Sequence, residues 1–440
     1  MLETIVALAT PPIRSALAIV RFSGEDCFKI VSKFFSKQID VTKSTIMHGF
    51  VMDGNTKIDE VVLLAYKGPR SFTGEDSIEI ICHGSPVIFN QIIELALKNG
   101  ARLATGGEYT SRAFMNNKLD LIQAESINDL INAETKEAKN IALMSLDGST
   151  SKLISPIKED IGYLLSLIEV NIDYPEYEDL EEANIEKIKD IMKKNIKYIG
   201  SLISDGNKGR IIRDGINIAI VGKPNVGKSS ILNALLNEDK AIVSSYKGTT
   251  RDVVEGKFIL NGVLINLFDT AGIRESDDYV EGIGITKSID KLNKADIVII
   301  VFDSMNLDEE DKKILDLIKN KDTIIVYNKS DINEYNNHDY IVTSAINKDV
   351  ESLKQAILKK LNLSNENYVN PSISSTRELG ILKNIKEMMA KVFNDASKGI
   401  SIDLLSADIK DIYLSILSLT GEDHDFDIAK EIFSRFCVGK

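Results

Sequence analysis

A glycine-rich octapeptide near the middle of the chain, Gly222-Lys-Pro-Asn-Val-Gly-Lys-Ser229, follows a short aliphatic run. Glycines at this spacing let successive backbone N–H groups turn inward around phosphate oxygens, and a helix that starts after them adds positive potential. In such a loop Lys228 would bind the β- and γ-phosphates, and the Ser229 hydroxyl would bind Mg²⁺. The octapeptide therefore predicts a nucleoside triphosphate site.

Further motifs follow in the order that a guanine nucleotide site requires. Gly248-Thr-Thr250 offers loop threonines to Mg²⁺ and the γ-phosphate, and Asp269-Thr-Ala-Gly272 ends an aliphatic run beside the Mg²⁺ position. Asn328-Lys-Ser-Asp331 ends another run, at the strand ends where ligands bind in such sheets. The Asp331 carboxylate can accept from guanine N1–H and the 2-amino group, whereas adenine lacks this paired donor edge. Ser344-Ala345 suits a backbone contact to the guanine oxygen, so the sequence favours GTP.

The residue after Gly272 is Ile273, where many switch GTPases carry a glutamine that orients the attacking water. Because isoleucine cannot hold a water molecule, either hydrolysis is slow or another element assists it. Glu281 is an acidic candidate for the water. From the residues alone, an exposed loop carboxylate is the more ordinary interpretation of Glu281.

Short aliphatic runs alternate with helix-like stretches in the part of the chain that carries these motifs. The runs are Ile216–Val221, Val263–Phe268, Ile297–Phe302, Thr323–Tyr327 and Tyr340–Thr343, and the helical stretches are Ser229–Leu236, Lys312–Ile318 and Val350–Leu361. Strands that are apolar on both faces and alternate with helices are typical of a mostly parallel sheet covered on both sides. We predict a doubly wound α/β domain over residues 213–371.

Both flanks of this domain carry apolar residues at helical spacing, over residues 119–212 and 372–440. We interpret them as one helical domain interrupted by the α/β domain, because insertion is tolerated where chain ends lie close together. Two separate helical bundles are the alternative. Residues 1–118 mix strand-like and helical segments with glycine-rich turns, which predicts an α+β domain.

The composition excludes several classes of protein. The 440 residues are 43% apolar, so each domain can bury a core, and 66 acidic against 53 basic side chains give a net charge of −13. That balance excludes a protein that holds nucleic acid by bulk charge, although a local basic groove is compatible with it. The cysteines and histidines show no metal-ligand spacing. No apolar run spans a membrane, and we expect a cytoplasmic protein.

Two features have more than one interpretation. Seven carboxylates and no basic residue lie between Asp173 and Glu186. A solvated loop is the ordinary interpretation, and a contact for a basic partner is the other. Cys437 stands alone near the C-terminus and fits either a reactive thiol or a tolerated one.

Several blocks of the sequence resemble the bacterial tRNA-modification GTPase family MnmE, also called TrmE. They are Thr10-Pro-Pro, Val20-Arg-Phe-Ser-Gly24, Ser71-Phe-Thr-Gly-Glu-Asp76, Arg112-Ala-Phe-Met-Asn-Asn-Lys-Leu-Asp-Leu-Ile-Gln-Ala-Glu125, Gly248-Thr-Thr-Arg-Asp252 and Phe436-Cys-Val-Gly-Lys440. The resemblance extends over the whole chain. It implies a multidomain α/β protein with a Ras-like doubly wound G domain inserted in an all-α helical domain. A preceding α+β domain, residues 1–118, would bind folate and form the dimer.

The resemblance implies GTP hydrolysis stimulated by K⁺ when the two G domains of a homodimer meet. The implied K⁺ ligands are Asn225, Ser244, Tyr246 and Thr249. A fixed cation can act as an arginine finger does, which would supply what Ile273 lacks. Glu281 matches the water-orienting glutamate of the family, and Ser229 and Thr250 would bind Mg²⁺.

Together, the motifs and the resemblance define the expected GTP contacts. These are Asn225, Val226, Gly227, Lys228, Ser229, Ser230, Ser244, Ser245, Tyr246, Lys247, Gly248, Thr249, Thr250, Asp269, Thr270, Ala271, Gly272, Asn328, Lys329, Ser330, Asp331, Ser344, Ala345 and Ile346.

The implied role is modification of the wobble uridine of certain tRNAs at C5, giving a carboxymethylaminomethyl-type group. The implied partner is an FAD-dependent protein, MnmG (GidA), and a 5-formyl- or methylene-tetrahydrofolate would supply the one-carbon unit. The folate positions of the family fall on Arg21, Glu79, Lys118 and Lys440. Basic side chains suit the anionic glutamate tail of folate, and a carboxylate suits the paired N–H edge of the pterin.

Two other classes of protein share some of the nucleotide motifs. A GTPase switch in ribosome assembly, without covalent chemistry, shares all of them but has no need of a folate pocket in residues 1–118. A P-loop ATPase or kinase would have no use for the guanine-reading Asp331. The resemblance favours the tRNA-modification enzyme over both.

Overall fold

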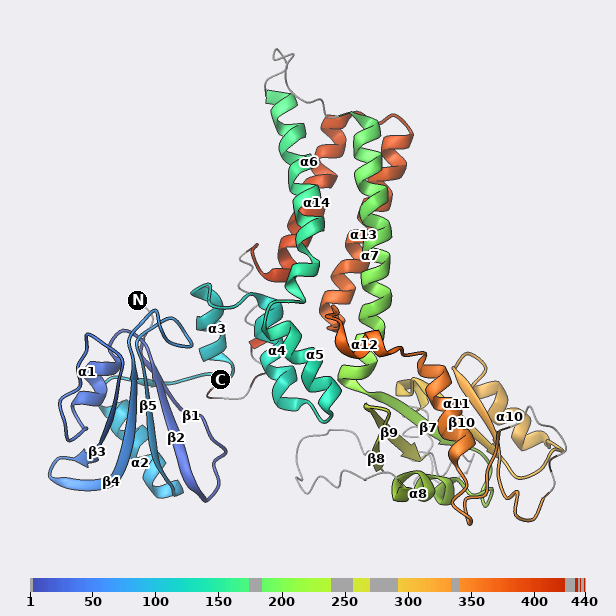
Figure 1. Ribbon diagram of the computed structural model, residues 1–440, viewed down its shortest axis with the longest axis horizontal. Coiled ribbons are helices and arrows are strands. Elements are labelled where there is room, and N and C mark those ends of the chain that lie inside the picture. The colour runs from blue at the N-terminus through green and yellow to red at the C-terminus, as the bar shows by residue number, and fades with distance from the viewer. Residues whose placement is uncertain are drawn as a thin grey trace, which may run out of the picture. The chain divides into compact units, whose positions relative to one another are not determined.

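Two six-stranded sheets and several long helices form the computed structural model (Figure 1). It describes residues 3–173, 184–238, 256–269, 292–333, 335, 341–423, 432–433, 436 and 439. The chain divides into a first unit, Met1–Asn128 with Leu146–Ile188 and Asp395–Lys440, and a second unit, Asp129–Ser145 with Lys189–Asn394. Within the described ranges, no helix is both long and apolar enough to cross a bilayer.

The sheet of the first unit has the strand order β3-β4-β5-β2-β1-β6. Its strands are β1 (Ile5–Leu8), β2 (Ser15–Ser23), β3 (Thr45–Asp53), β4 (Thr56–Tyr66), β5 (Ser77–Gly84) and β6 (Arg102–Leu103). Val20 of β2 and Ile80 of β5 are buried with residues of α1 (Cys27–Ser32) and α2 (Pro86–Lys98). Because side chains alternate along a strand, their neighbours Arg21 and Glu79, which pair in register, point to the opposite face.

In chain order, the helices after this sheet are α3 (Glu108–Met115), α4 (Leu121–Asn132), α5 (Lys136–Leu146), the short 3₁₀ helix η1 (Ser151–Leu153) and α6 (Ser155–Asp173). Residues Asp129–Ser145, which include nearly all of α5, belong to the second unit. Helix α6 lies along α14 (Ile402–Thr420), as Figure 1 shows. Beyond α14, the chain returns to α4, where Phe433 and Phe436 are buried with Leu121 and Ala124. Phe433 and Phe436 are thus packed within the first unit.

The sheet of the second unit has the strand order β12-β11-β10-β7-β9-β8. Its strands are β7 (Ile216–Val221), β8 (Gly256–Leu260), β9 (Val263–Asp269), β10 (Ile297–Phe302), β11 (Thr323–Tyr327) and β12 (Ile341–Val342). The helices in the same stretch of the chain are α7 (Ile185–Asp214), α8 (Lys228–Glu238), α10 (Glu309–Leu317), α11 (Glu351–Leu361), α12 (Asn365–Val369) and α13 (Thr376–Ser397). Every neighbouring pair is parallel except β8 and β9. The predicted mostly parallel sheet is therefore present, with one antiparallel strand added at its edge.

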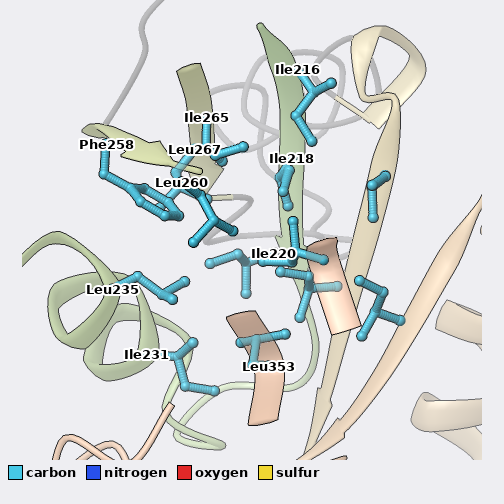
Figure 2. Packing of buried hydrophobic residues seen from close by; sticks show 14 of the residues in the cluster. Ile216, Ile218, Ile220, Ile231, Leu235, Phe258, Leu260, Ile265, Leu267 and Leu353 are labelled. Atoms are coloured by element: carbon cyan, nitrogen blue, oxygen red, sulfur yellow. The ribbon is translucent and has the colours of Figure 1, made fainter. Parts of the chain in front are cut away.

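Both faces of this sheet are covered, which explains why its strands are apolar throughout. Ile218 and Ile220 of β7 lie in a cluster with residues of α8 and α11 (Figure 2). Ala219 and Val221 lie in a second cluster, against which α10 packs. Burying an Ile or Val side chain contributes about 1.5–3 kcal/mol. The two clusters hold the strands in place, so the loops at their carboxyl ends are presented along one edge.

Candidate functional site

The predicted phosphate loop joins β7 to α8 and has a backbone that favours glycine. Gly222, Asn225 and Gly227 have φ angles of 149°, 64° and 99°. A Cβ on Gly227 would lie 2.1 Å from Nδ2 of Asn328, and one on Gly222 would lie 2.5 Å from the carbonyl oxygen of Val301. Only glycine fits these two positions, and the turns between them form a loop suited to surrounding an anion.

Lys228 is held over this loop at the start of α8. Its ammonium donates hydrogen bonds to the carbonyl oxygens of Gly222, at 2.9 Å, and Lys223, at 2.8 Å. Ser229 and Ser230 follow in the first turn of the helix. A cationic side chain, a hydroxyl and a helix N-terminus thus meet at one loop, which is the set of groups that binds a phosphate and its Mg²⁺.

Asn328 connects the phosphate loop to the motifs at the far strands. It is buried directly after β11, and its Nδ2 donates to the carbonyl oxygen of Val226 at 2.9 Å. Its Oδ1 accepts from the Thr343 hydroxyl and the Ala345 amide, each at 3.2 Å. The Ser330 amide donates to the carbonyl oxygen of Thr343 at 3.1 Å. One side chain therefore joins three motifs that lie far apart in the sequence.

The residue predicted to read guanine is held at the same edge. Oδ1 of Asp331 accepts a hydrogen bond from the Ser344 hydroxyl at 2.7 Å, which orients the carboxylate. Lys329 has a φ of 64°, and its ammonium pairs with Asp303 at 2.8 Å. Ile346 is 79% exposed beyond them. The structure thus brings the phosphate loop and both base-side motifs to one edge of the sheet.

Asp269 ends β9 beside the phosphate-loop strand, and its register partner on β7 is Ile220. The other predicted nucleotide, metal and water contacts lie outside the described residues. They are Ser244, Ser245, Tyr246, Lys247, Gly248, Thr249, Thr250, Thr270, Ala271, Gly272 and Glu281. Ile273 and most of the acidic run between Asp173 and Glu186 also lie outside them. The K⁺ and water parts of the site stay predictions.

A cavity of about 370 Å³ lies in the first unit, on the sheet face opposite α1 and α2. It is lined by Arg21, Tyr66, Arg70, Ser71, Phe72, Thr73, Ser77, Glu79 and Tyr109. The Arg21 guanidinium pairs with Oε1 of Glu79 at 2.8 Å and donates to the carbonyl oxygen of Gly439 at 3.1 Å. A cation and a carboxylate are thus fixed side by side at the wall of the cavity.

Tyr109 completes this wall from α3. Its hydroxyl donates to the carbonyl oxygen of Arg21 at 2.7 Å, and the Arg21 guanidinium lies 5.6 Å from the ring centroid. Burial raises the pKa of the Tyr109 hydroxyl, so the group stays a neutral donor. Reasoning from the sequence assigned no role to Tyr66, Arg70 or Tyr109. The one signal near them was the block Ser71–Asp76, which carried the family resemblance without a function.

Of the two other predicted folate residues, only Lys118 is among the residues that the structure describes, and it does not line this cavity. Lys118 lies between α3 and α4, and its ammonium donates to the carbonyl oxygen of Pro69 at 3.1 Å, next to Arg70 of the cavity. Lys118 lines a separate cavity of about 630 Å³ instead. Lys440 and Cys437 lie outside the described residues.

A buried ion-pair network supports the loop beside the first cavity. The Arg112 side chain is 2% exposed and pairs with Glu75 and Glu108, each at 2.9 Å. Although burial opposes it, hydrogen bonds from Arg102, the Thr105 amide and Arg112 lower the pKa of the Glu108 carboxyl to about 2. The charged network fixes α3, and with it Tyr109, against the sheet.

Comparison with known proteins finds relatives along the full length of the chain. A family model described as the MnmE helical domain matches residues 121–437, and one described as the GTP-binding protein TrmE N-terminus matches residues 4–118. The protein named tRNA modification GTPase MnmE from Malacoplasma penetrans (strain HF-2) is 45% identical and covers 100% of both chains. The protein of that name from Ligilactobacillus salivarius (strain UCC118) is 40% identical, over 100% of this chain and 98% of its own.

A solved structure that matches this chain covers part of it. A crystal structure of an Aquifex aeolicus Era variant bound to GDP and AlF₄⁻ is 29% identical and covers 40% of this chain and 67% of that one, with a TM-score of 0.28. The family assignment therefore rests on the full-length sequence relatives and the two family models.

Proposed function

The chain belongs to the MnmE family of tRNA modification GTPases, and from that premise we propose its particular role. It is the GTP-hydrolysing subunit of a complex that adds a carboxymethylaminomethyl-type group to C5 of the wobble uridine of certain tRNAs. A 5-formyl- or methylene-tetrahydrofolate supplies the one-carbon unit. The chain acts as a homodimer with the FAD-dependent protein MnmG (GidA).

The observation that supports this role is the presence of two binding regions of different chemistry on one chain. The phosphate loop with Asp331 suits a guanine nucleotide. The cavity with Arg21 and Glu79 pairs a cation with a carboxylate, as the glutamate tail and pterin edge of a folate require. A switch in ribosome assembly is not favoured, because the match to the TrmE N-terminus covers residues 4–118.

The proposed division of labour follows the predicted domains. Residues 213–371 hydrolyse GTP, residues 119–212 and 372–440 form the helical domain, and residues 1–118 bind folate and form the dimer. Lys118 and the C-terminal Lys440 would complete the folate site with Arg21 and Glu79.

In the G domain, Ser229 and Thr250 hold Mg²⁺, which neutralises charge on the phosphates. Ser229 suits this role because it opens α8 directly after the loop. Asn225, Ser244, Tyr246 and Thr249 hold K⁺, and Glu281 orients the attacking water. When bound, K⁺ would supply positive charge toward the phosphates as an arginine finger does, and Glu281 would supply the water contact that Ile273 cannot provide.

Reconstitution tests the role directly. The purified chain, an MnmG-type partner, GTP, KCl, methylene-tetrahydrofolate, an unmodified tRNA and glycine, whose amine would supply the carboxymethylamino part of the group, are incubated together. The wobble nucleoside is then analysed by mass spectrometry. We expect a mass gain that disappears when GTP, the folate or the partner is omitted. GTP hydrolysis without any modified nucleoside, under conditions where a known family member modifies the same tRNA, would overturn the proposed role and leave only a GTPase.

The cation requirement is tested separately by steady-state hydrolysis in KCl and in NaCl at matched ionic strength. We expect a large rate advantage in K⁺ that Asn225→Ala abolishes and Glu281→Ala lowers. Equal rates in both salts would contradict the proposed K⁺ site without affecting the GTP site.

A further inference from the structure

The second residue of the phosphate loop, Lys223, makes contacts that nucleotide binding does not by itself require. Its ammonium lies 2.7 Å from Oδ2 of Asp308 and 2.9 Å from Oδ2 of Asp311. Both carboxylates belong to the start of α10, 85 residues further along the chain in the case of Asp308. The Lys223 side chain therefore links the phosphate loop to α10, the helix that connects β10 to β11.

The two aspartates are themselves fixed by the helix cap. Oδ1 of Asp308 accepts from the amides of Glu310, at 3.0 Å, and Asp311, at 3.1 Å. Oδ2 of Asp311 accepts from the Asp308 amide at 3.1 Å, which completes a capping box. Hydrogen bonding to Lys223 lowers the pKa of the Asp308 carboxyl to about 2. The anchor for Lys223 is thus built into the start of a helix.

The Lys223–Asp311 pair differs from an ordinary surface ion pair, although the Asp308 side chain is 57% exposed. Exposed pairs contribute little because both side chains stay hydrated and lose entropy when they meet. Here the Asp311 side chain is 3% exposed, and among the described residues its Oδ1 has no hydrogen-bond partner. Leaving a buried carboxylate without a cation costs free energy, so the Asp311 carboxylate favours a conformation in which the Lys223 ammonium stays beside it.

The main chain of Lys223 extends the link to the phosphate-binding lysine. The carbonyl oxygen of Lys223 accepts a hydrogen bond from the Lys228 ammonium at 2.8 Å. A shift of residue 223 would therefore move an acceptor that locates Lys228, and displacements of about 1 Å in such positions can cost about a hundredfold in activity.

We propose that Lys223 is a positioning residue for nucleotide binding, which acts by anchoring the phosphate loop to Asp308 and Asp311 of α10. The inference rests on Lys228 binding the nucleotide phosphates, as proposed above. Lys228→Ala tests that premise separately. An unchanged GDP affinity in this variant would show that Lys228 does not bind the phosphates, independently of the result for Lys223.

The experiment compares GDP dissociation constants, and kcat and KM for GTP, in the full chain and its variants. Lys223→Met removes the ammonium and keeps an unbranched side chain that is one atom shorter. We expect about a tenfold weaker GDP affinity and a similar rise in KM, with kcat changed less than about twofold. Lys223→Arg should restore affinity to within about twofold, because a guanidinium can span both carboxylates.

Asp311→Asn separates positioning from simple charge attraction. Removing a negative charge near the loop would strengthen binding of an anionic nucleotide if long-range electrostatics decided the affinity. Positioning predicts the opposite result, weaker GDP binding, and no further loss when Asp311→Asn is combined with Lys223→Met. Asp311→Asn also keeps the test open if Lys223→Met does not fold.

Lys312→Met is the matched control, because Lys312 lies on the same helix and pairs with Glu309 in an exposed position. Its GDP affinity should equal that of the unchanged chain. Tighter GDP binding by Asp311→Asn, unchanged binding by Lys223→Met, or an equal loss in Lys312→Met would each overturn the proposal.

Discussion

The nucleotide site and the Arg21–Glu79 cavity are built from the sequence in different ways. The phosphate loop is one contiguous segment whose function depends on backbone conformation, with positive φ angles at Gly222, Asn225 and Gly227. The cavity depends on side chains that lie 58 residues apart and meet because β2 and β5 pair in register. A site formed by one contiguous loop can be recognised as a motif in the sequence. A site formed by strand pairing cannot, because its residues are far apart in the chain.

The largest effect that distinguishes the two sites is expected at Asp331. Asp331→Asn should weaken GTP binding at least about a hundredfold, because guanine N1–H and the 2-amino group lose a charged acceptor. Binding of xanthosine triphosphate should improve, since xanthine has a carbonyl at C2 in place of the amino group of guanine. The side-chain amide of the variant can donate a hydrogen bond to that carbonyl. Nucleotide titrations measure both effects, and an unchanged GTP affinity would exclude Asp331 as the residue that reads guanine.

A smaller effect is expected in the first unit. Glu79→Gln should weaken 5-formyltetrahydrofolate binding about tenfold or more, because a charged hydrogen bond to the pterin is lost. GTP hydrolysis should not change. Glu60→Gln, at an exposed carboxylate on β4 that pairs with His48, is the matched control. Equal folate affinities in the two variants would remove Glu79 from the proposed folate site.

The sequence predicts an element correctly where a single contiguous segment has a characteristic pattern of residues. Continuous apolar runs identified β7, β9, β10 and β11, because both faces of that sheet are covered. Strand β8 was not predicted, since it lies at the edge with alternating burial. The contact of Lys223 with Asp311 and the packing of Tyr109 on Arg21 could not be predicted either, because topology alone brings these residues together.

A third expected effect concerns stability beside the Arg21–Glu79 cavity. Glu108→Gln should destabilise the first unit by about 1–3 kcal/mol at pH 7, because Arg102 and Arg112 lose a charged acceptor. The pKa of Glu108 is about 2 in the folded chain and about 4.3 when unfolded. Its stabilisation is therefore complete above about pH 4.3 and is lost as the pH falls through about 2.

Hydrogen exchange of the amides in α3 at pH 7 and at pH 3 measures this effect. The difference between the unchanged chain and Glu108→Gln should shrink at the lower pH. A difference that stays constant would mean that the substitution acts through packing and not through charge.

The smallest expected effect is at the edge of the second sheet. Lys257 of β8 pairs with Glu134 at 2.6 Å, and both side chains are partly exposed. Lys257→Met should lower the free energy of unfolding by no more than about 1 kcal/mol and leave GDP affinity within about twofold. Urea unfolding and GDP titration test this together. A tenfold loss of GDP affinity would show that β8 influences the nucleotide site.

The central claim is that one chain carries a guanine nucleotide site and a separate folate site. Calorimetric titration of GDP and of 5-formyltetrahydrofolate into the unchanged chain, Asp331→Asn and Glu79→Gln tests it most directly. We predict that the unchanged chain binds both ligands, that Asp331→Asn loses only GDP, and that Glu79→Gln loses only the folate. The claim would be contradicted if the unchanged chain did not bind the folate, or if either substitution abolished binding of both ligands.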